Sequence, residues 1–272
     1  MIQFSNKEIS EMSYTDFVGF INQWNVLPGA YNTLNKWGVF SRIDNKSRVL
    51  ELACTSGFSL RELANMFNCS GVGIDISKES VQSAIFNKDM YNPNLNIEYS
   101  VDNGDSYENK EKFTHVVVGA ALKFFPNPEH TIKRIVNNYL EDGGCLLVSP
   151  FYAVSDVPDS LFKECQRVFG IDITNTSYKD NMKLYKDFEI IYEDKNPLVK
   201  ETEEELAHYC ESTINRACEM RNISDQTTKQ IMYERLMEIK KMSNALRDYQ
   251  NYSTLVLRYR KNIFPNRYTE LF

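Results

Sequence analysis

The sequence predicts an α/β protein in which a mostly parallel sheet of seven strands carries helices on both faces. Three observations carry this prediction. Apolar runs alternate with helical patterns from Arg48 to about Ser149. The stretch RVLELACTSGFSLREL (residues 48–63) passes from a strand signal through a turn of small residues into an amphipathic helix, and YSTLVLRY (252–259) alternates like an antiparallel strand. Alternating strands and helices imply right-handed βαβ units, whose parallel strands are covered by helices.

Seven short segments have the apolar, β-branched composition of buried strands. They span residues 49–53, 72–76, 97–101, 115–120, 145–149, 188–193 and 252–259. Between the fourth and fifth, FPNPEHTIKRIVNNYLEDGG predicts a helix. Asn127 can cap it, Pro128 suits its first position, and Gly143 with Gly144 can end it.

The remaining sequence divides into parts of different character. We expect an N-terminal helical lid in residues 1–47, a core in 48–200, a helical insertion in 201–250, and the last core strand with a C-terminal tail in 251–272. The insertion begins with TEEE, which has the spacing of a capping box. Two apolar stripes at helical spacing follow, formed by Leu206, Cys210, Ile214 and Ala217 and then by Met232, Leu236, Ile239, Met242 and Leu246.

Composition and charge exclude several classes of protein. Hydrophobic residues make up 42% of the chain, enough to build a core, so the chain is not a disordered protein. The formal net charge of −6 and the lack of a long basic run argue against a nucleic-acid partner. No apolar segment reaches the roughly 18 residues that a membrane span needs, and no signal peptide is evident. We therefore expect a cytoplasmic protein with neither membrane nor nucleic acid as partner.

The cysteines and histidines indicate neither a metal site nor a disulfide framework. Six cysteines are scattered without a C-x-x-C pair, and the three histidines do not cluster with them. We expect buried free thiols.

The turn after the first strand is suited to a polar or anionic ligand. A strand that ends in small residues and feeds a helix presents free N–H groups and the positive end of the helix dipole. In the G-x-G-x-x-G pattern of dinucleotide sites, however, Ala53, Thr55 and Phe58 would replace the glycines, which argues against NAD. No G-K-[ST] follows, so a P-loop is excluded.

Four segments together resemble a known family. VLELACTSG, GVGIDIS, FTHVVVGAAL and GGCLLVSPF resemble the class I S-adenosylmethionine-dependent methyltransferases, in particular the small-molecule branch. The resemblance covers residues 48–151 in register and extends loosely to Tyr259. It implies a Rossmann-like fold, S-adenosylmethionine as cofactor and S-adenosylhomocysteine as product.

The resemblance also assigns the first turn. The family reads approximately E/D-x-G-x-G-x-G there, so Glu51 matches the acid, while Ala53, Thr55 and Gly57 occupy the glycine positions and Cys54 lies between them. Glu51 would neutralise the methionine ammonium, and the Thr55 hydroxyl could bind the methionine carboxylate. Alanine is tolerable at position 53 if φ stays negative, whereas a β-branched residue resists a positive φ. Replacement of Gly57 should be the most harmful.

The second strand ends in Asp75, about 20 residues beyond the turn, where a carboxylate can accept both ribose hydroxyls. The alternative is a helix N-terminal acid, although Ser77 is a better cap. By resemblance, Ile76 would pack on the adenine.

The ends of the third and fourth strands complete the expected cofactor site. Family sequences place an acid near the adenine edge, and this chain offers Asp102, Asn103 and Asp105, of which Asn103 is best in register. The alternative is a polar Asn-Gly turn. Gly119 and Ala120 would leave room near the sulfonium for donor and acceptor to meet.

Residues that bind the acceptor should come from outside this framework. The hypothesis names Tyr14, Trp24 and Tyr31 from the aromatic N-terminal segment, with packing of that segment on the sheet as the alternative. Lys123, Phe151 and Tyr152 follow strands four and five and are better placed. His208 could act as a base or be structural. No catalytic residue is assigned, because methyl transfer chiefly requires alignment.

The favoured function is methyl transfer from S-adenosylmethionine to an O, N or C atom of a small biosynthetic molecule. The strand-four exit GAALKFF lacks the D/N-P-P-Y pattern of nucleic-acid amino-methylating relatives. One alternative is a protein that binds S-adenosylmethionine without transferring methyl, such as a sensor; methylation of protein or nucleic acid ranks lower. The 201–250 insertion is a cap, a homodimer surface, or a cover for one sheet edge.

Overall fold

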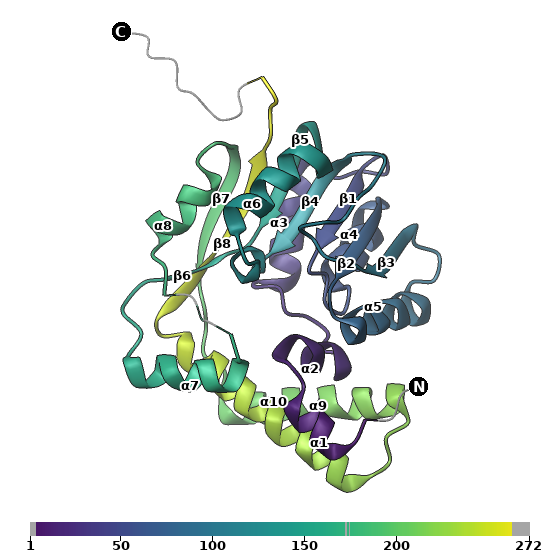
Figure 1. The fold of residues 1–272 in the computed structure, drawn as a ribbon, viewed down its shortest axis with the longest axis vertical. Helices are drawn as coiled ribbons and strands as arrows, with labels where there is room; N and C mark the ends of the chain where they lie inside the picture. The colour runs from purple at the N-terminus through teal and green to yellow at the C-terminus, as the bar shows by residue number, and fades with distance from the viewer. Residues whose placement is uncertain (1–3, 172, 174, 263–272) are drawn as a thin grey trace.

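A computed structural model describes residues 4–171, 173 and 175–262. Within this part of the chain, eight strands form one sheet in the order β3-β2-β1-β4-β5-β8-β6, and β7 also pairs with β8 (Figure 1). The strands are β1 (Arg48–Leu52), β2 (Ser70–Asp75), β3 (Ile97–Val101), β4 (Phe113–Gly119), β5 (Leu140–Val148), β6 (Phe151–Ala153), β7 (Glu189–Pro197) and β8 (Gln250–Arg258). β1 to β5 pair in parallel, and β8 runs antiparallel to its neighbours. The predicted mostly parallel sheet is confirmed, and the structure adds the short β6.

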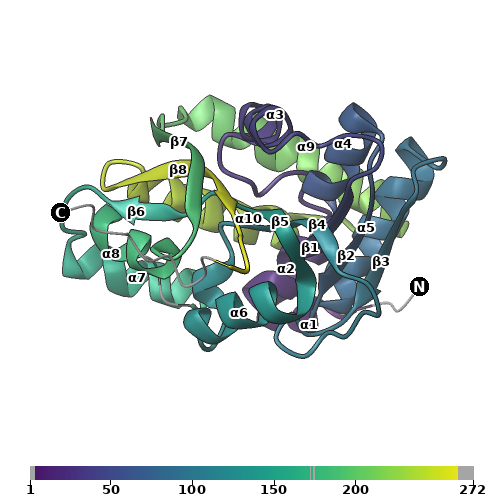
Figure 2. The ribbon, with the colours of Figure 1, turned by 90° about the horizontal axis from the view of Figure 1, so that it is seen from above.

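Helices cover both faces of the sheet. They are α1 (Asn6–Glu11), α2 (Tyr14–Phe20), α3 (Ala30–Ser41), α4 (Phe58–Phe67), α5 (Lys78–Tyr91), α6 (Pro128–Arg134), α7 (Asp159–Phe169), α8 (Tyr178–Met182), α9 (Glu203–Arg221) and α10 (Gln226–Leu246). On one face, Trp37 of α3 and Leu60 of α4 join a buried cluster with Val117. On the other, Ile132 of α6 packs with Val116 (Figure 2). The alternating side chains of β4 thus serve two cores, as expected of a sheet buried on both faces.

A third core lies outside the sheet. Helices α1, α2, α7, α9 and α10 pack together below it in Figure 1 and bury a cluster that includes Phe17, Cys165, Ile214 and Leu236. We call these five helices the helical cap. The cap meets the sheet at the carboxyl end of β2, where the Ser77 hydroxyl donates to Asp16 of α2 at 2.7 Å. The cap therefore faces the edge at which α/β proteins bind ligands.

The helices of residues 201–250 belong to this cap. The capping box at Thr202 and Glu205 is confirmed. All members of both predicted stripes are buried except the half-buried Met242, and all except Leu206 belong to the cap core. The two helices therefore pack on other helices of the same chain.

One predicted helix end is wrong. Asn127 caps α6 as predicted, accepting from the His130 N–H at 3.0 Å. The helix then ends in a π-helical turn (Ile135–Tyr139), and β5 begins at Leu140, so the glycine pair lies within the strand. A Cβ on Gly144 would lie 2.7 Å from the Thr114 carbonyl oxygen of β4. Gly144 therefore allows β5 to approach β4 closely and does not end a helix.

Four further features concern the cysteines, metal ligands, membrane-spanning helices and the C-terminal tail. All six cysteines are buried and free. Among the described residues, no cluster of histidine, cysteine and acidic side chains could hold a metal ion. No helix in the described ranges combines the length and the apolar character needed to cross a bilayer. Most of the predicted C-terminal tail lies outside the described residues.

Candidate functional site

The turn after β1 is held in left-handed backbone conformations. The φ values of Ala53, Thr55 and Gly57 are +56°, +47° and +76°, so all three positions that are glycine in the family pattern need a positive φ. The condition under which alanine would be tolerable at position 53, a negative φ, is therefore not met. A left-handed L-residue costs roughly 1–2 kcal/mol. The two substituted positions therefore store strain at the site, which is common where function fixes the backbone.

Gly57 is restricted by space as well as by φ. It begins α4, and a Cβ there would lie 2.7 Å from the Tyr99 ring and 2.9 Å from the Ala84 Cβ. The Tyr99 hydroxyl in turn donates to the Gly57 carbonyl at 2.8 Å. Any side chain at position 57 must displace the residues that hold the turn. Beside it, Cys54 is buried, and its N–H donates to the Ile74 carbonyl at 3.0 Å.

Glu51, on β1, is a buried acid, 5% exposed. Its Oε2 accepts from the Leu60 N–H at 3.0 Å, and burial raises the pKa of its carboxyl to about 8. Among the described residues, no lysine, arginine or histidine forms an ion pair with it. A buried carboxyl without a cation is costly unless a ligand neutralises it. Glu51 is thus suited to the ammonium group of a methionine-like ligand.

Asp75 ties the turn to the second strand. Its two carboxylate oxygens accept from the Thr55 N–H at 3.0 Å and from the Ser77 N–H at 2.8 Å. Burial raises the pKa of the Asp75 carboxyl, and the two N–H donors oppose that shift. Each oxygen keeps a further lone pair for a ligand. Ser77 caps α5 as predicted, which leaves the carboxylate free of that role.

Ile76 follows directly and is 69% exposed. An apolar side chain presented to solvent beside a buried carboxylate is suited to stack on a flat ring.

The third-strand exit is a compact polar turn. Asp102 accepts from the Asn103 N–H at 2.7 Å, and the Asn103 side-chain oxygen accepts from the Asp105 N–H at 2.9 Å. The Asp102 N–H donates to the Asp75 carbonyl at 3.0 Å, which holds this turn beside the second strand. Both side chains therefore shape the turn, and the exposed Asn103 keeps its NH₂ group unbonded in the described structure.

At the end of β4, Gly119 has φ +57° and Ala120 follows it, half-buried. The Gly119 carbonyl accepts from the Ser149 N–H at 2.7 Å. A Cβ on Gly119 would lie 3.5 Å from Leu27 of the N-terminal segment. That segment therefore reaches the middle of the sheet edge.

The three N-terminal aromatic candidates lie apart. Tyr14 packs edge-on against Phe169 of α7, with ring centres 5.4 Å apart. The Trp24 ring has the Arg61 guanidinium 4.3 Å away and the Arg216 guanidinium 5.6 Å away. All three groups pack at the junction of core and cap.

Tyr31 is 48% exposed and lies edge-on to Phe58, with ring centres 5.3 Å apart. Trp24 and Tyr31 thus pack against residues of α4, whereas Tyr14 is part of the helical cap.

The candidates that follow strands four and five are closer together. Lys123 Nζ lies 5.9 Å from the Phe151 ring centre and 5.4 Å from that of Phe124. Tyr152 is buried against Tyr178 of α8, so it takes no part in this pair. His208 is exposed on α9.

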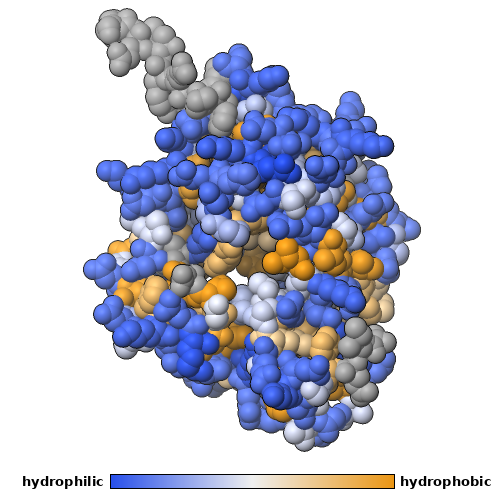
Figure 3. Space-filling model, viewed as in Figure 1, coloured by the Kyte–Doolittle hydropathy of each residue, from blue (hydrophilic) through white to orange (hydrophobic). Residues whose placement is uncertain are grey.

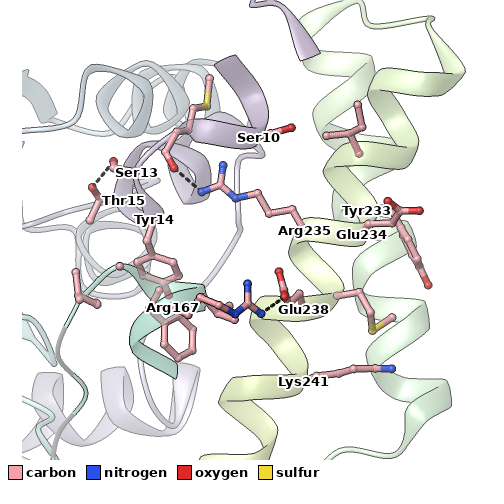
Figure 4. A pocket seen from close by; sticks show the side chains of 17 residues that line it. Ser10, Ser13, Tyr14, Thr15, Arg167, Tyr233, Glu234, Arg235, Glu238 and Lys241 are labelled. Atoms are coloured by element: carbon pink, nitrogen blue, oxygen red, sulfur yellow. Dashed lines mark hydrogen bonds and ion pairs between the residues drawn. The ribbon is translucent and has the colours of Figure 1, made fainter. Parts of the chain in front are cut away.

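A groove of about 870 Å³ runs through the cap between α2, the end of α7 and α10 (Figure 4). Tyr14 lines it, together with Arg167, which pairs with Glu238, and Arg235, which donates to the Met12 carbonyl. None of the strand-end residues lines this groove, so it is distinct from the site at the sheet edge. Figure 3 shows that the surface is also hollowed where cap and sheet meet.

Sequence reasoning missed a buried polar network that joins cap and turn. Asn22 and Asn87 exchange two side-chain hydrogen bonds of 2.8 Å, and Asn87 also donates to the Ser56 carbonyl at 3.0 Å. The Ser56 hydroxyl donates to the Gln23 carbonyl at 2.5 Å. The partners are up to 65 residues apart, so no local pattern could have indicated them.

Comparison with known proteins agrees with this arrangement. A family model described as a methyltransferase domain matches residues 43–234. No curated protein matches the chain.

Several solved structures have a similar fold. The MccD protein is 26% identical (TM-score 0.68; 87% of this chain and 100% of that one are covered). A Geobacter sulfurreducens S-adenosylmethionine-dependent methyltransferase with S-adenosylhomocysteine is 17% identical (TM-score 0.66; 96% and 100%). Haemonchus contortus phosphoethanolamine N-methyltransferase 2, with phosphomonomethylethanolamine and S-adenosylhomocysteine, is 16% identical (TM-score 0.66; 92% and 61%). Because the family model matches well over half of the chain and the fold agrees over most of it, the protein belongs to the class I S-adenosylmethionine-dependent methyltransferases.

Proposed function

We propose that the protein transfers the methyl group of S-adenosylmethionine to an O, N or C atom of a small molecule bound between the sheet edge and the helical cap. One observation carries the proposal. Two buried carboxyl groups, Glu51 and Asp75, flank the strained turn after β1, and neither has a cationic partner among the described residues. An ammonium and a pair of hydroxyls are the groups that such carboxylates would bind.

We assign the cofactor contacts accordingly. Glu51 would hold the methionine ammonium and Asp75 the ribose hydroxyls, and Ile76 with Asn103 would contact the base. The turn of Ala53, Cys54, Thr55 and Gly57 would pass beneath the nucleoside, and Asp102 would keep the neighbouring turn in place. Gly119 and Ala120, small and half-buried at the end of β4, would leave room for the acceptor. This set rests on the two buried acids and on the left-handed backbone at Ala53, Thr55, Gly57 and Gly119.

The bound cofactor supplies an electrophilic methyl group. That methyl group would bond to the acceptor's lone pair while the electrons of the broken sulfur–carbon bond stay on sulfur, and any acceptor proton would pass to solvent or a base. The chain contributes alignment and exclusion of water, and well-oriented reactions gain on the order of 7–11 kcal/mol from positioning. No catalytic base is assigned.

The acceptor is proposed to be a small biosynthetic molecule. The cap lies across the sheet edge and restricts the space there, and the net charge of −6 disfavours nucleic acid. The small phosphorylated amine in the Haemonchus contortus enzyme is consistent with this proposal. Six unpaired cysteines are typical of a reducing compartment, which favours the cytoplasm.

The test has two parts. Calorimetry with S-adenosylhomocysteine should show saturable binding, and mass spectrometry should detect a labelled methyl group moving from S-adenosylmethionine to a small molecule of a cell extract. Binding without transfer to any small molecule would instead favour a protein that senses the cofactor. The absence of binding by folded protein would reject the proposal.

A further inference from the structure

We propose that the acceptor carries an oxyanion, a carboxylate or a phosphate group, and that Lys123 binds it. This inference rests on the proposed function, because it names the class of acceptor for the same site.

The position of Lys123 in the fold supports the proposal. It lies in the 3₁₀ turn Leu122–Phe124, which begins three residues after Gly119, the last residue of β4. β4 stands between β1, whose turn flanks the cofactor site, and β5. Lys123 is therefore at the centre of the edge where acceptor and donor must meet.

The surroundings of Lys123 lack a partner for its charge. The side chain is half-buried, and its Nζ contacts the rings of Phe124 and Phe151. It makes no hydrogen bond or ion pair with the described residues. Two other half-buried lysines of the chain do have partners, since Lys36 pairs with Asp194 and Lys240 with Glu201 at 3.0 Å. A desolvated ammonium beside aromatic rings and without a charged partner is suited to bind an anion.

The electrostatics agree with this role. Burial, with no charged neighbour contributing, lowers the pKa of Lys123 to about 7. An oxyanion at Nζ would favour the charged ammonium and return the pKa toward its ordinary value. It would also offset the positive charge that the sulfonium brings to the same edge.

The neighbouring strand ends in a buried hydroxyl group without a partner among the described residues. The Ser149 hydroxyl at the end of β5 is buried and makes no hydrogen bond with the described residues, while its N–H binds the Gly119 carbonyl. Buried hydroxyls normally find partners.

The experiment titrates Lys123 directly. Protein with ¹³C-labelled lysine is saturated with S-adenosylhomocysteine, and NMR follows the lysine methylene signals against pH. Inorganic phosphate and acetate are the probes, and sodium chloride at equal ionic strength is the control. The signal of Lys123 is assigned by its loss in Lys123→Met. We expect phosphate or acetate to raise the Lys123 pKa, and the stronger of the two identifies the acceptor group.

Matched variants separate this inference from the proposed function. Lys123→Met should weaken phosphate or acetate binding about tenfold or more, the scale of a charged hydrogen bond, and leave S-adenosylhomocysteine affinity within about twofold. Lys46→Met, at the exposed opposite end of the sheet, should change neither. If S-adenosylhomocysteine binds but neither anion shifts the Lys123 titration, the inference is overturned and the proposed function stands. If S-adenosylhomocysteine fails to bind, the proposed function itself fails.

Discussion

At single residues of this site, the state that favours folding differs from the state that favours ligand binding. Glu51 is buried, and its carboxyl is more stable protonated in the free protein, yet a ligand ammonium requires the carboxylate. Thr55 holds φ at +47°, although glycine would hold it with less strain. Such residues lower the stability of the free protein and become favourable only with a ligand bound.

Replacing Glu51 by Gln should therefore stabilise the free protein. The pKa of Glu51 is raised to about 8 from an ordinary value of 4.5. The folded state holds a proton that the unfolded chain loses in this range, so the contribution of Glu51 to stability falls as pH rises from about 4.5 to about 8. Thermal melts should place Glu51→Gln above the wild type at the alkaline end, with a gap that narrows toward acid pH.

Glu98→Gln, on the exposed side of β3, is the control and should not show this pH dependence. The same Glu51→Gln protein should bind S-adenosylhomocysteine more weakly. Equal melting curves at every pH would contradict the prediction.

Asp75→Ala should weaken S-adenosylhomocysteine binding by about 1.5–3 kcal/mol, or roughly 10- to 150-fold, because a charged hydrogen-bond acceptor is lost. Calorimetry measures the affinity. Asp75→Asn should retain more of the stability, since one oxygen can still accept a backbone N–H. The exposed Asp89→Ala on α5 is the control, and an affinity unchanged by Asp75→Ala would remove this residue from the site.

At the scale of elements, the attachment of the N-terminal segment to the sheet determines the shape of the site. The chain that leaves α2 is bound to α5 and to the cofactor turn by Asn22, Asn87 and Ser56. Leu27 then contacts the position of Gly119. The segment after α2 and the cofactor turn are therefore joined by buried hydrogen bonds, and loss of one buried partner should destabilise both.

A double-mutant cycle tests this connection. Asn22→Ala and Asn87→Ala should each lower the free energy of unfolding by about 1–3 kcal/mol, because each leaves a buried amide unpaired. The double variant should lose less than the sum, since it leaves neither partner of the pair behind. Urea denaturation gives the values. The solvent-exposed contact between Asn92 and Asn65, 3.3 Å long, provides the control cycle, which should show almost no coupling.

At the scale of the whole molecule, the cap has its own core. Residues from both ends of the chain build it, because Phe17 of α2 packs in the same cluster as Ile214 of α9 and Leu236 of α10. The apolar stripes that suggested a homodimer surface are thus already buried within one chain. The arrangement favours the interpretation of residues 201–250 as a cap.

We accordingly expect a monomer. Sedimentation equilibrium should return a mass near 31.7 kDa across the accessible concentrations, since α9 and α10 have little apolar surface left to bury against a second copy. A stable dimer would contradict this prediction. Residues 201–250 could then still form the dimer surface, but through side chains other than the two apolar stripes.

The sequence by itself determined the parallel sheet, the turn of small residues after the first strand and the acids at the strand ends. These features depend on local signals, namely apolar runs, small residues at a turn, and Asp75 at the end of a strand. Local signals also misled at Gly143 and Gly144, which resemble a helix end but lie within β5, where Gly144 allows the close approach to β4. The three residues of β6 were too few to form a pattern.

Only the tertiary structure decided which side chains meet. Three contacts depend on segments far apart in the chain. Lys123 lies beside the Phe151 ring without a carboxylate partner, and Asn22 hydrogen-bonds to Asn87. The Trp24 ring has two guanidinium groups near it. Spacing in a sequence fixes the face of an element on which a residue lies, but packing between elements fixes its partners.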